Sequence, residues 1–307
     1  MKQRSASPPP VTPVVLRRRP LRQRLTGWAF VLPFAVPFLL AVVAPIVYTA
    51  GLSLFQERLI GGVTFVGLDN YGEQLSDPRF WDGVARVGLF LLIQVPLMMG
   101  FALGAALALD SARLYAPAIF RLGIFLPYAV PGVVASLLWG YIYGAQFGLV
   151  GDLKELFDIA LPDPLSSTLI LPSISNIGLW LYVGYNMLVL YAALQSIPSE
   201  LFEAARIDGA GTWHIIVGIK LPAIRATLVF TTIFSVIGGF QLFNEPNILR
   251  AMVPNVISTD FTPNMYAYTL SFAGQQYNSA AAVAMIMGVV TAVVAFTVQR
   301  RGMKGAV

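Results

Sequence analysis

The side chains best suited to a specific interaction lie together in residues 197–222. This stretch holds Glu200, Glu203 and Asp208, and it also holds His214, the only histidine of the chain. The chain contains no cysteine, which excludes thiolate metal sites and thiol nucleophiles, and a single histidine excludes multi-histidine metal centres. We find no acid and base that the topology would bring together for catalysis. The residues therefore favour recognition over catalysis, with no cofactor or metal on this chain.

The same stretch predicts a short helix, a break and a second short helix. Pro198 suits a first helical turn, and Glu200 and Glu203 suit the positive end of the helix dipole. Gly209 should break the helix because glycine adopts a positive φ, and Thr212 is expected to cap the second helix. The result is a loop with an apolar and acidic face, which fits either a partner protein or the lipid interface.

The elements that must position this loop are membrane spans. Of the 307 residues, 57% are hydrophobic and 11% are charged, whereas a soluble domain carries roughly 25% charge. A charged side chain at the bilayer centre costs roughly 2.5–3.5 kcal/mol, so spans should lack charge. Six long stretches contain no Asp, Glu, Lys or Arg: 25–56, 87–109, 122–151, 164–199, 226–244 and 261–299. We therefore predict an all-α polytopic membrane protein with six transmembrane helices.

Lysine and arginine predict the orientation of these spans. With both termini cytoplasmic, 15 of the 20 basic residues lie inside and 5 outside, as the positive-inside rule requires. The net charge of +5 is thus explained by topology and does not call for a nucleic-acid partner. Residues 1–24 are expected to form a basic cytoplasmic tail and 25–307 the six-helix domain, with a cytoplasmic loop at 197–222.

The cytoplasmic loop at 197–222, called the coupling loop from here on, carries a resemblance to a known family. Three runs of the loop look like the EAA motif of binding-protein-dependent ABC transporter permeases: Glu203-Ala204-Ala205, Asp208-Gly209-Ala210 and Leu221-Pro222. Within that superfamily the chain most resembles the carbohydrate-import permeases of the maltose and glycerol-phosphate type. It departs from them after the fifth span, where residues 250–254 replace the usual Thr-x-Gly-Gly-Pro. The resemblance implies the MetI-like fold of a type I importer permease.

The resemblance also implies partners. They are a second homologous permease subunit, two cytoplasmic ATP-binding subunits that hold ATP and Mg, and an extracytoplasmic solute-binding protein. The chain itself has no G-x-x-x-x-G-K-[ST] phosphate loop, which agrees with a separate ATPase. The three runs would couple the permease to the ATPase, with Glu203 entering a cleft on that subunit. The implied place is the lipid of the plasma (inner) membrane of a prokaryote.

The implied activity is the import of a sugar or small oligosaccharide, which needs aromatic faces and hydrogen-bonding side chains near the bilayer midplane. Ten residues of the fourth and fifth spans and the segment after them are candidates for this path: Trp180, Tyr182, Tyr185, Asn186, Ser235, Gly239, Gln241, Phe243, Asn244 and Glu245. Two other roles stay open for them. Aromatic residues near helix ends also anchor proteins at the membrane interface, and Ser, Asn and Gln also bond between helices.

Other transport functions are the alternatives. The chain could be an ABC permease for glycerol phosphate, a polyol or an amino acid, or an ion-coupled secondary transporter. A phosphate-bearing substrate favours basic residues in the path, and ion coupling usually places carboxylates or a histidine inside spans. The six stretches hold neither basic residues nor carboxylates, and His214 lies in the coupling loop. These observations favour a neutral carbohydrate.

Overall fold

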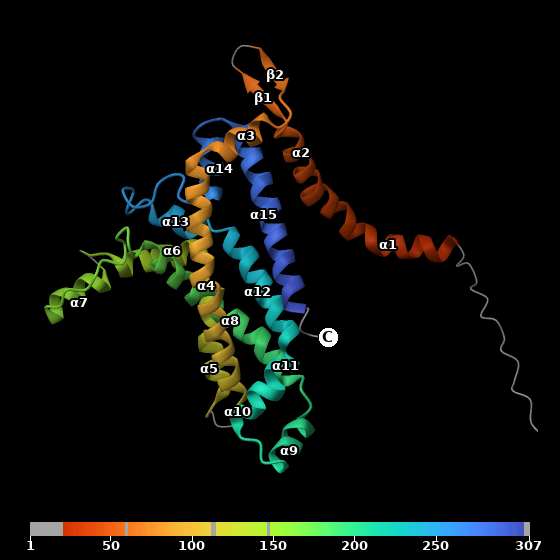
Figure 1. Cartoon of the computed structure of the whole chain (residues 1–307), viewed down its shortest axis with the longest axis vertical. Coiled ribbons are helices and arrows are strands. Elements are labelled where there is room, and N and C mark those ends of the chain that lie inside the picture. Colours follow the sequence, from red (N-terminus) through yellow and green to blue (C-terminus); the bar gives the residue numbers. More distant parts are fainter. Residues whose placement is uncertain (1–20, 59–60, 112–114, 146–147, 304–307) are drawn as a thin grey trace, which may run out of the picture. The chain divides into compact units, whose positions relative to one another are not determined.

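The computed structural model describes residues 21–58, 61–111, 115–145 and 148–303 (Figure 1). Two antiparallel strands form one hairpin, β1 (Phe55–Arg58) and β2 (Gly62–Phe65), with Phe55 opposite Phe65. The helices are α1 (Leu21–Phe38), α2 (Ala44–Leu52), α3 (Asp69–Ser76), α4 (Pro78–Asp110), α5 (Pro117–Phe125), α6 (Gly132–Tyr143), α7 (Leu149–Phe157), α8 (Ile170–Gln195), α9 (Ser199–Ile207), α10 (Thr212–Ile215), α11 (Leu221–Ala223), α12 (Arg225–Phe240), α13 (Asn244–Leu249), α14 (Pro263–Phe272) and α15 (Tyr277–Met303). Three tighter or wider turns join them: the π-helix η1 (Leu39–Val43), the 3₁₀-helix η2 (Leu126–Ala129) and the π-helix η3 (Ile216–Lys220).

The chain divides into two compact units, Met1–Thr49 and Ala50–Val307. In the first unit, Pro33 and Pro37 lie inside α1, and the π-helix η1 follows them directly. Proline removes backbone donors from a helix, and such positions are where the hydrogen-bond ladder changes register. The predicted basic tail, residues 1–24, lies for the most part outside the described residues.

The all-α prediction is confirmed, with one refinement to the spans. Within the described residues, five helical segments are long and apolar enough to cross a membrane: Trp28–Leu52, Pro78–Asp110, Ile170–Gln195, Arg225–Leu249 and Tyr277–Gly302. The sixth candidate is a helix pair, Pro117–Ala129 and Gly132–Tyr143, which is bent by 98° at the break. The predicted third span, 122–151, is therefore not a straight helix. Pro127 starts a 3₁₀ turn there, and Pro131 becomes the N-cap of α6.

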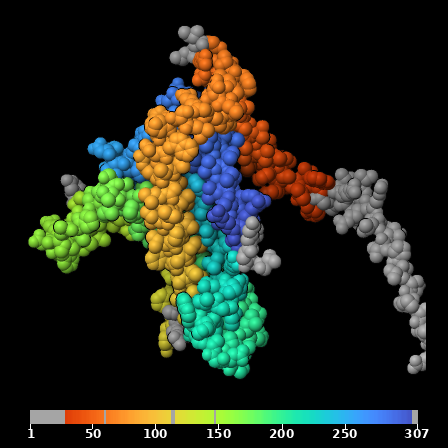
Figure 2. Space-filling view, in the orientation of Figure 1, coloured from red at the N-terminus to blue at the C-terminus, as the bar shows by residue number. Residues whose placement is uncertain are grey.

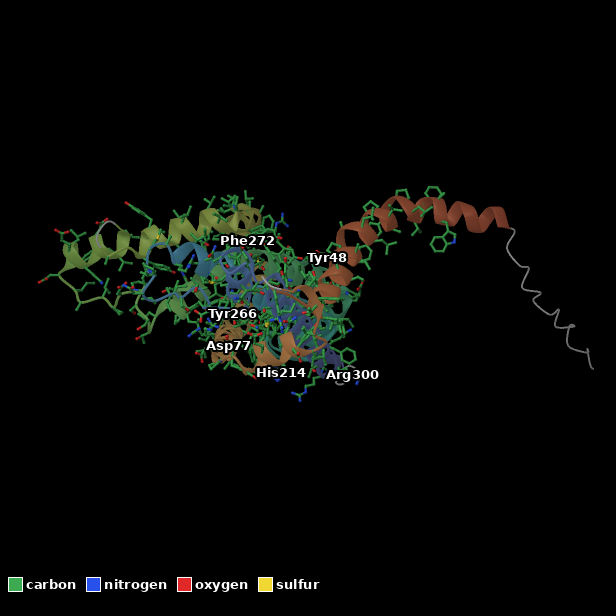
Figure 3. The ribbon with its side chains drawn as sticks, turned by 90° about the horizontal axis from the view of Figure 1, so that it is seen from above. Tyr48, Asp77, His214, Tyr266, Phe272 and Arg300 are labelled. Atoms are coloured by element: carbon green, nitrogen blue, oxygen red, sulfur yellow. The ribbon has the colours of Figure 1, made fainter. Side chains whose placement is uncertain are left out.

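Helix α4 is longer than the charge-free stretch 87–109 because its first turns carry charged residues that continue the helix beyond the apolar zone. Asp77 caps its N-terminus by accepting a hydrogen bond from the Arg79 backbone at 2.9 Å. The Tyr266 hydroxyl of α14 donates to the same carboxylate at 2.7 Å, and Figure 3 labels both residues. Hydrogen bonds from the Arg79 guanidinium lower the pKa of Asp77 from 3.8 to about 2. Asp77 thus stays charged at neutral pH and ties α4 to α14.

Helices α4 and α8 form the central pair of the larger unit. One cluster of buried side chains joins the C-terminal halves of the two helices and includes Ala102, Ala106, Met187 and Leu190. A second cluster joins their N-terminal halves and includes Phe90, Ile174 and Ile177. Helix α12 packs against both helices of this pair, and α15 packs against α12. In Figure 1 the hairpin and α3 lie at one end of the unit, and α9, α10 and α11 lie at the other.

Candidate transport cavity and coupling segment

The predicted coupling loop folds as a helix with a complete C-terminal cap. Helix α9 carries Glu203, Ala204 and Ala205, and Gly209 follows it with φ +83°. The Ala210 amide donates to the Ala205 carbonyl at 2.9 Å, and the Gly209 amide donates to the Arg206 carbonyl at 3.1 Å. These two bonds are those of the Schellman motif, which needs a residue in the left-handed conformation at the glycine position. The E-A-A-x-x-D-G-A pattern therefore encodes a short helix and the turn that ends it.

The coupling segment, residues 197–224, presents an unusual surface. Glu203, Ala204, Asp208 and Gly209 are all exposed. Large apolar side chains are exposed beside them: Leu201 at 50%, Ile207 at 86% and Trp213 at 72%. In Figure 2 this segment (teal) stands at the lower end of the larger unit. An exposed set of apolar side chains with polar neighbours is typical of a surface that meets a partner or a membrane.

The second half of the segment differs in detail from the sequence prediction. Gly211, not Thr212, is the N-cap of α10, and Thr212 is the first helical residue. The chain then widens into η3 before Leu221 and Pro222 open α11. Pro222 has no amide hydrogen and cannot donate the hydrogen bond that a regular helix would have at this position. The wide turn directly before it therefore costs no hydrogen bond at Pro222. Leu221 and Pro222 thus lead into α12 and are separate from the α9 helix and its turn.

A cavity of about 400 Å³ lies between the long helices of the larger unit. Gln94 lies sixteen residues from each end of α4 and borders this cavity. Tyr182, close to the middle of α8, borders it as well. The cavity is therefore near half-height of the two central helices, and its volume falls within the range of roughly 300–1,000 Å³ that small-molecule sites have.

Three tyrosines form an aromatic face of the cavity. Tyr128 of η2 stacks on Tyr185 of α8, with ring centroids 5.0 Å apart and planes at 20°. Tyr128 also meets Tyr182 edge to face, with centroids 6.3 Å apart. Each ring offers an apolar face and a hydroxyl, so the group can cover the apolar side of a ligand and bond to its polar edge.

The polar side chains of the cavity are mostly uncharged. Asn186 donates to the Tyr182 carbonyl at 3.0 Å and to the Met98 sulfur at 3.6 Å, so its amide nitrogen already joins α8 to α4. The Oε1 atom of Gln94 is buried and has no hydrogen-bond partner among the described residues. Glu245 is the only charged side chain among the described residues that line the cavity.

Eight of the ten predicted path residues line this cavity: Tyr182, Tyr185, Asn186, Ser235, Gly239, Gln241, Asn244 and Glu245. The break between α12 and α13 is what brings the last three of them to it. Two predicted residues do not line it. Trp180 lies edge to face with Trp139 at 6.0 Å in the buried cluster, and Phe243 packs on Tyr268 at 5.3 Å. For Trp180 this follows from the helical period, which turns it away from the face of α8 that Tyr182 and Tyr185 share.

Among the lining residues that the sequence did not predict, two have side chains that form strong hydrogen bonds, Gln94 and Tyr128. Gln94 is the one amide inside the charge-free stretch 87–109, and a lone amide in a span is itself a signal of a buried polar contact. Tyr128 lies between Pro127 and Pro131, and it reaches the cavity because those prolines break the third span. An aromatic residue beside such a break was the available signal.

Gly178 and Gly184 determine how closely the neighbouring elements approach α8. A Cβ atom at Gly178 would meet the Gln94 side chain, and one at Gly184 would meet the backbone of Ile124 and Phe125. Glycine at 178 leaves room for the Gln94 amide, and glycine at 184 lets the end of α5, directly before η2 and Tyr128, lie against the α8 backbone.

Comparisons with known proteins agree with this arrangement. The chain is 31% identical over 280 residues to the lactose transport system permease protein LacF of Rhizobium radiobacter, covering 89% of this chain and 92% of that protein. It is 30% identical over 268 residues to the sulfoquinovosyl glycerol transport system permease protein SmoG of Agrobacterium fabrum, covering 86% of this chain and 87% of that protein. Its fold matches the crystal structure of a bacterial alginate ABC transporter in complex with an alginate pentasaccharide-bound periplasmic protein. That match has a TM-score of 0.79 and 20% identity, and it covers 93% of this chain and 96% of the other.

The family-level match extends over nearly the whole chain. Residues 13–302 match the family described as the binding-protein-dependent transport system inner membrane component. This range contains the coupling segment, the cavity and all the candidate spans. The chain therefore belongs to the family of binding-protein-dependent transport system inner membrane components, a family of multi-pass transport permeases.

Proposed function

We propose that this chain is the permease subunit of an ATP-driven ABC importer in the plasma membrane of a prokaryote, and that it carries a neutral sugar or small oligosaccharide into the cytoplasm. The proposal rests on the central cavity, whose tyrosines and amides suit a ligand with apolar faces and many hydroxyls. The relatives named for lactose and for sulfoquinovosyl glycerol support the same substrate class. Among the described lining residues there is no lysine or arginine, which disfavours a phosphate-bearing substrate.

In this function the coupling segment meets the ATPase. The exposed side chains of Glu203 and Ile207, four residues apart, share one face of α9 and form its contact surface. A partner cleft that covers this surface would remove apolar area from water and pair the carboxylate with basic or polar groups. A second permease, two ATP-binding subunits and a solute-binding protein complete the assembly. The periplasmic protein bound to the alginate transporter supports the last of these partners.

Transport would follow from alternating access. ATP, held with Mg on the partner subunits, closes the ATPase pair, and α9 moves with the cleft that holds it. The helices that follow α9 then open the cavity to one side of the membrane or to the other. In this chain the aromatic face and the polar groups around the cavity hold the sugar between the two openings.

The assembly is tested by recovering the chain with its partners. We expect a tagged chain, extracted from native membranes in mild detergent, to carry with it a second permease and an ATPase that has a phosphate loop, both identified by mass spectrometry. Because the chain has no cysteine, Ala204→Cys introduces a single thiol on exposed α9 for crosslinking to that ATPase. Recovery of the chain alone, even after crosslinking, would contradict the ABC assignment and favour a secondary transporter.

The cavity is tested at Gln94. A buried polar atom with no partner costs about 1–3 kcal/mol, so Gln94→Leu should leave stability equal or higher. The same change removes a hydrogen-bonding group from the cavity wall, which is expected to lower uptake about three- to tenfold. Uptake is measured with the sugar that the co-purified binding protein retains, and stability is measured as the melting temperature in detergent.

The opposite directions of these two effects separate a cavity role from misfolding. The matched control is Gln276→Leu, because Gln276 is exposed in the turn before α15 and lies outside the cavity lining. Uptake by Gln94→Leu that equals uptake by this control would remove Gln94 from the substrate path.

A further inference from the structure

A charge cluster joins the coupling segment to the two central helices, with a largely buried ion pair and an exposed glutamine beside it. Asp110 is the last residue of α4, Gln195 is the last residue of α8, and Lys220 is the last residue of η3. The Lys220 ammonium pairs with Asp110 Oδ2, and the Gln195 amide donates to Asp110 Oδ1 at 2.6 Å. The side chains of Asp110 and Lys220 are only 9% and 15% exposed. Both carboxylate oxygens are thus occupied. We refer to these three residues as the Asp110 cluster.

The cluster is not explained by the stability of the helices themselves. An acidic residue at the C-terminal end of a helix is unfavourable, because the helix dipole is negative there. Two helix ends meet at this place, those of α4 and α8, and Asp110 adds a further negative charge. The Lys220 ammonium is the positive group that compensates the two negative helix ends and the Asp110 carboxylate. Loss of either charge would leave the other buried without a partner, which is strongly unfavourable.

Lys220 also contacts the helix that carries Glu203. Its ammonium lies over the ring of Phe202 on α9, 5.3 Å from the ring centroid. Lys220 therefore contacts α9 on one side and the end of α4 on the other. Among the described residues the only other ion pair is Arg79–Asp77, at the start of α4. No other described basic residue therefore pairs with the end of α4 while it also contacts α9.

The α4–α8 pair continues from this cluster to the cavity. The buried side chains Ala102, Ala106, Met187 and Leu190 fill the space between the helices along that length. Closely packed interiors transmit displacement because they are nearly incompressible. Gln94 lies sixteen residues from Asp110 on the same helix, a distance of about 24 Å along the axis. Helix α4 is continuous from Asp110 to Gln94, with Pro96 inside it near the cavity, so a displacement at Asp110 is carried along this helix to the cavity wall.

We propose that Lys220 is the positioning residue that ties the coupling helix α9 to the α4–α8 pair, so that movement of α9 changes the access to the cavity. Lys220 does so by holding Phe202 and Asp110 at once. This inference rests on the proposed function, because it requires an ATPase to move α9. It adds a specific mechanical link, within this chain, between the docking surface and the substrate path.

The test uses the assembled transporter in proteoliposomes and does not need the substrate. Ser235→Cys places the only thiol of this chain in the cavity wall, and its labelling by a membrane-impermeant maleimide reports access. Mg-ATP is expected to change the labelling rate in this parent chain. Lys220→Met and Asp110→Asn should each reduce that ATP-dependent change about tenfold, which lies within the range that mutations in coupled networks produce. Lys220→Arg, which keeps the charge, should retain it.

A double variant shows whether the two residues act as one unit. If they do, Lys220→Met with Asp110→Asn should reduce the ATP-dependent change no further than either single variant. Lys154→Met and Asp82→Asn are the matched controls, since they remove the same charges on α7 and at the other end of α4. Both controls are expected to respond to Mg-ATP as the parent does.

The amount of co-purified ATPase distinguishes the possible failures. An unchanged amount, together with a lost response to ATP, supports a positioning role. A parent-like response in Lys220→Met, additive losses in the double variant, or loss of ATPase and response together would overturn the inference and leave the proposed function intact. A parent chain that recovers no ATPase would overturn the proposed function, and the inference with it.

Discussion

Gly209→Asp is expected to abolish uptake while the chain reaches the membrane in nearly normal amount. Gly209 holds φ +83°, where a side chain costs roughly 1–2 kcal/mol, and the Schellman bonds of the α9 cap depend on that conformation. The new carboxylate would also lie beside Asp208 at the negative end of α9. Gly209 is exposed and a Cβ there meets no other atom, so the damage stays local to the docking surface. The measurement is uptake together with the membrane abundance of the chain.

Gly211→Asp is the matched control for this change. Gly211 lies two residues further on, has φ −72° and is the N-cap of α10, a position that aspartate favours. It should therefore transport like the parent. Glu203→Lys tests the same surface independently, because it reverses an exposed charge on α9 without touching the turn. Normal uptake in both Gly209→Asp and Glu203→Lys would show that α9 is not the docking helix.

Gly184→Val is expected to fail at an earlier stage, by preventing a stable fold. A Cβ at this position would lie 2.7 Å from the Phe125 Cα and would also meet the Ile124 carbonyl, so the collision is with backbone. The valine would push α5 and η2 away from α8 and separate Tyr128 from Tyr185. Overpacking of this kind costs roughly 3 kcal/mol, the upper part of the usual range. We expect a melting temperature in detergent far below that of the parent, a low membrane abundance and no uptake.

The control for Gly184→Val is Gly288→Val in α15. Gly288 is also helical and within a candidate span, but a Cβ there would meet no atom within 4 Å. The same substitution should leave the melting temperature within a few degrees of the parent. Equal stability of the two valine variants would mean that α8 and η2 can separate at little cost, and the aromatic face would not depend on Gly184.

The coupling segment shows how far local sequence rules reach. The structure has the predicted short helix, its end at Asp208 and the positive φ of Gly209. The end of the helix and the positive φ follow from glycine's lack of a Cβ. The cap of α10 was predicted one residue too late, at Thr212 instead of Gly211. Both glycine and threonine can cap a helix, and which of the two becomes the N-cap depends on where the preceding turn ends.

The third span was the least predictable of the candidate spans. Its charge-free length, 122–151, predicts one helix, whereas the chain bends by 98° between η2 and α6. Pro127 and Pro131 indicate a weakened helix, but proline alone does not determine whether a span bends slightly or breaks. The close approach at Gly184 adds a contact from outside the span, because the end of α5, directly before η2, lies against the α8 backbone there.

Three features could be predicted from the sequence: which segments can leave water, which turn needs glycine, and to which family the coupling motif is similar. These are local properties, since charge, apolar length and backbone freedom act within one segment. Other contacts could be seen only in the structure: Asp110 meets Lys220, 110 residues away, Tyr128 stacks on Tyr185, and Gln94 borders the cavity with an oxygen that has no partner among the described residues. Such pairs depend on how closely and at what rotation helices pack, and this is decided by side chains distributed over the whole unit.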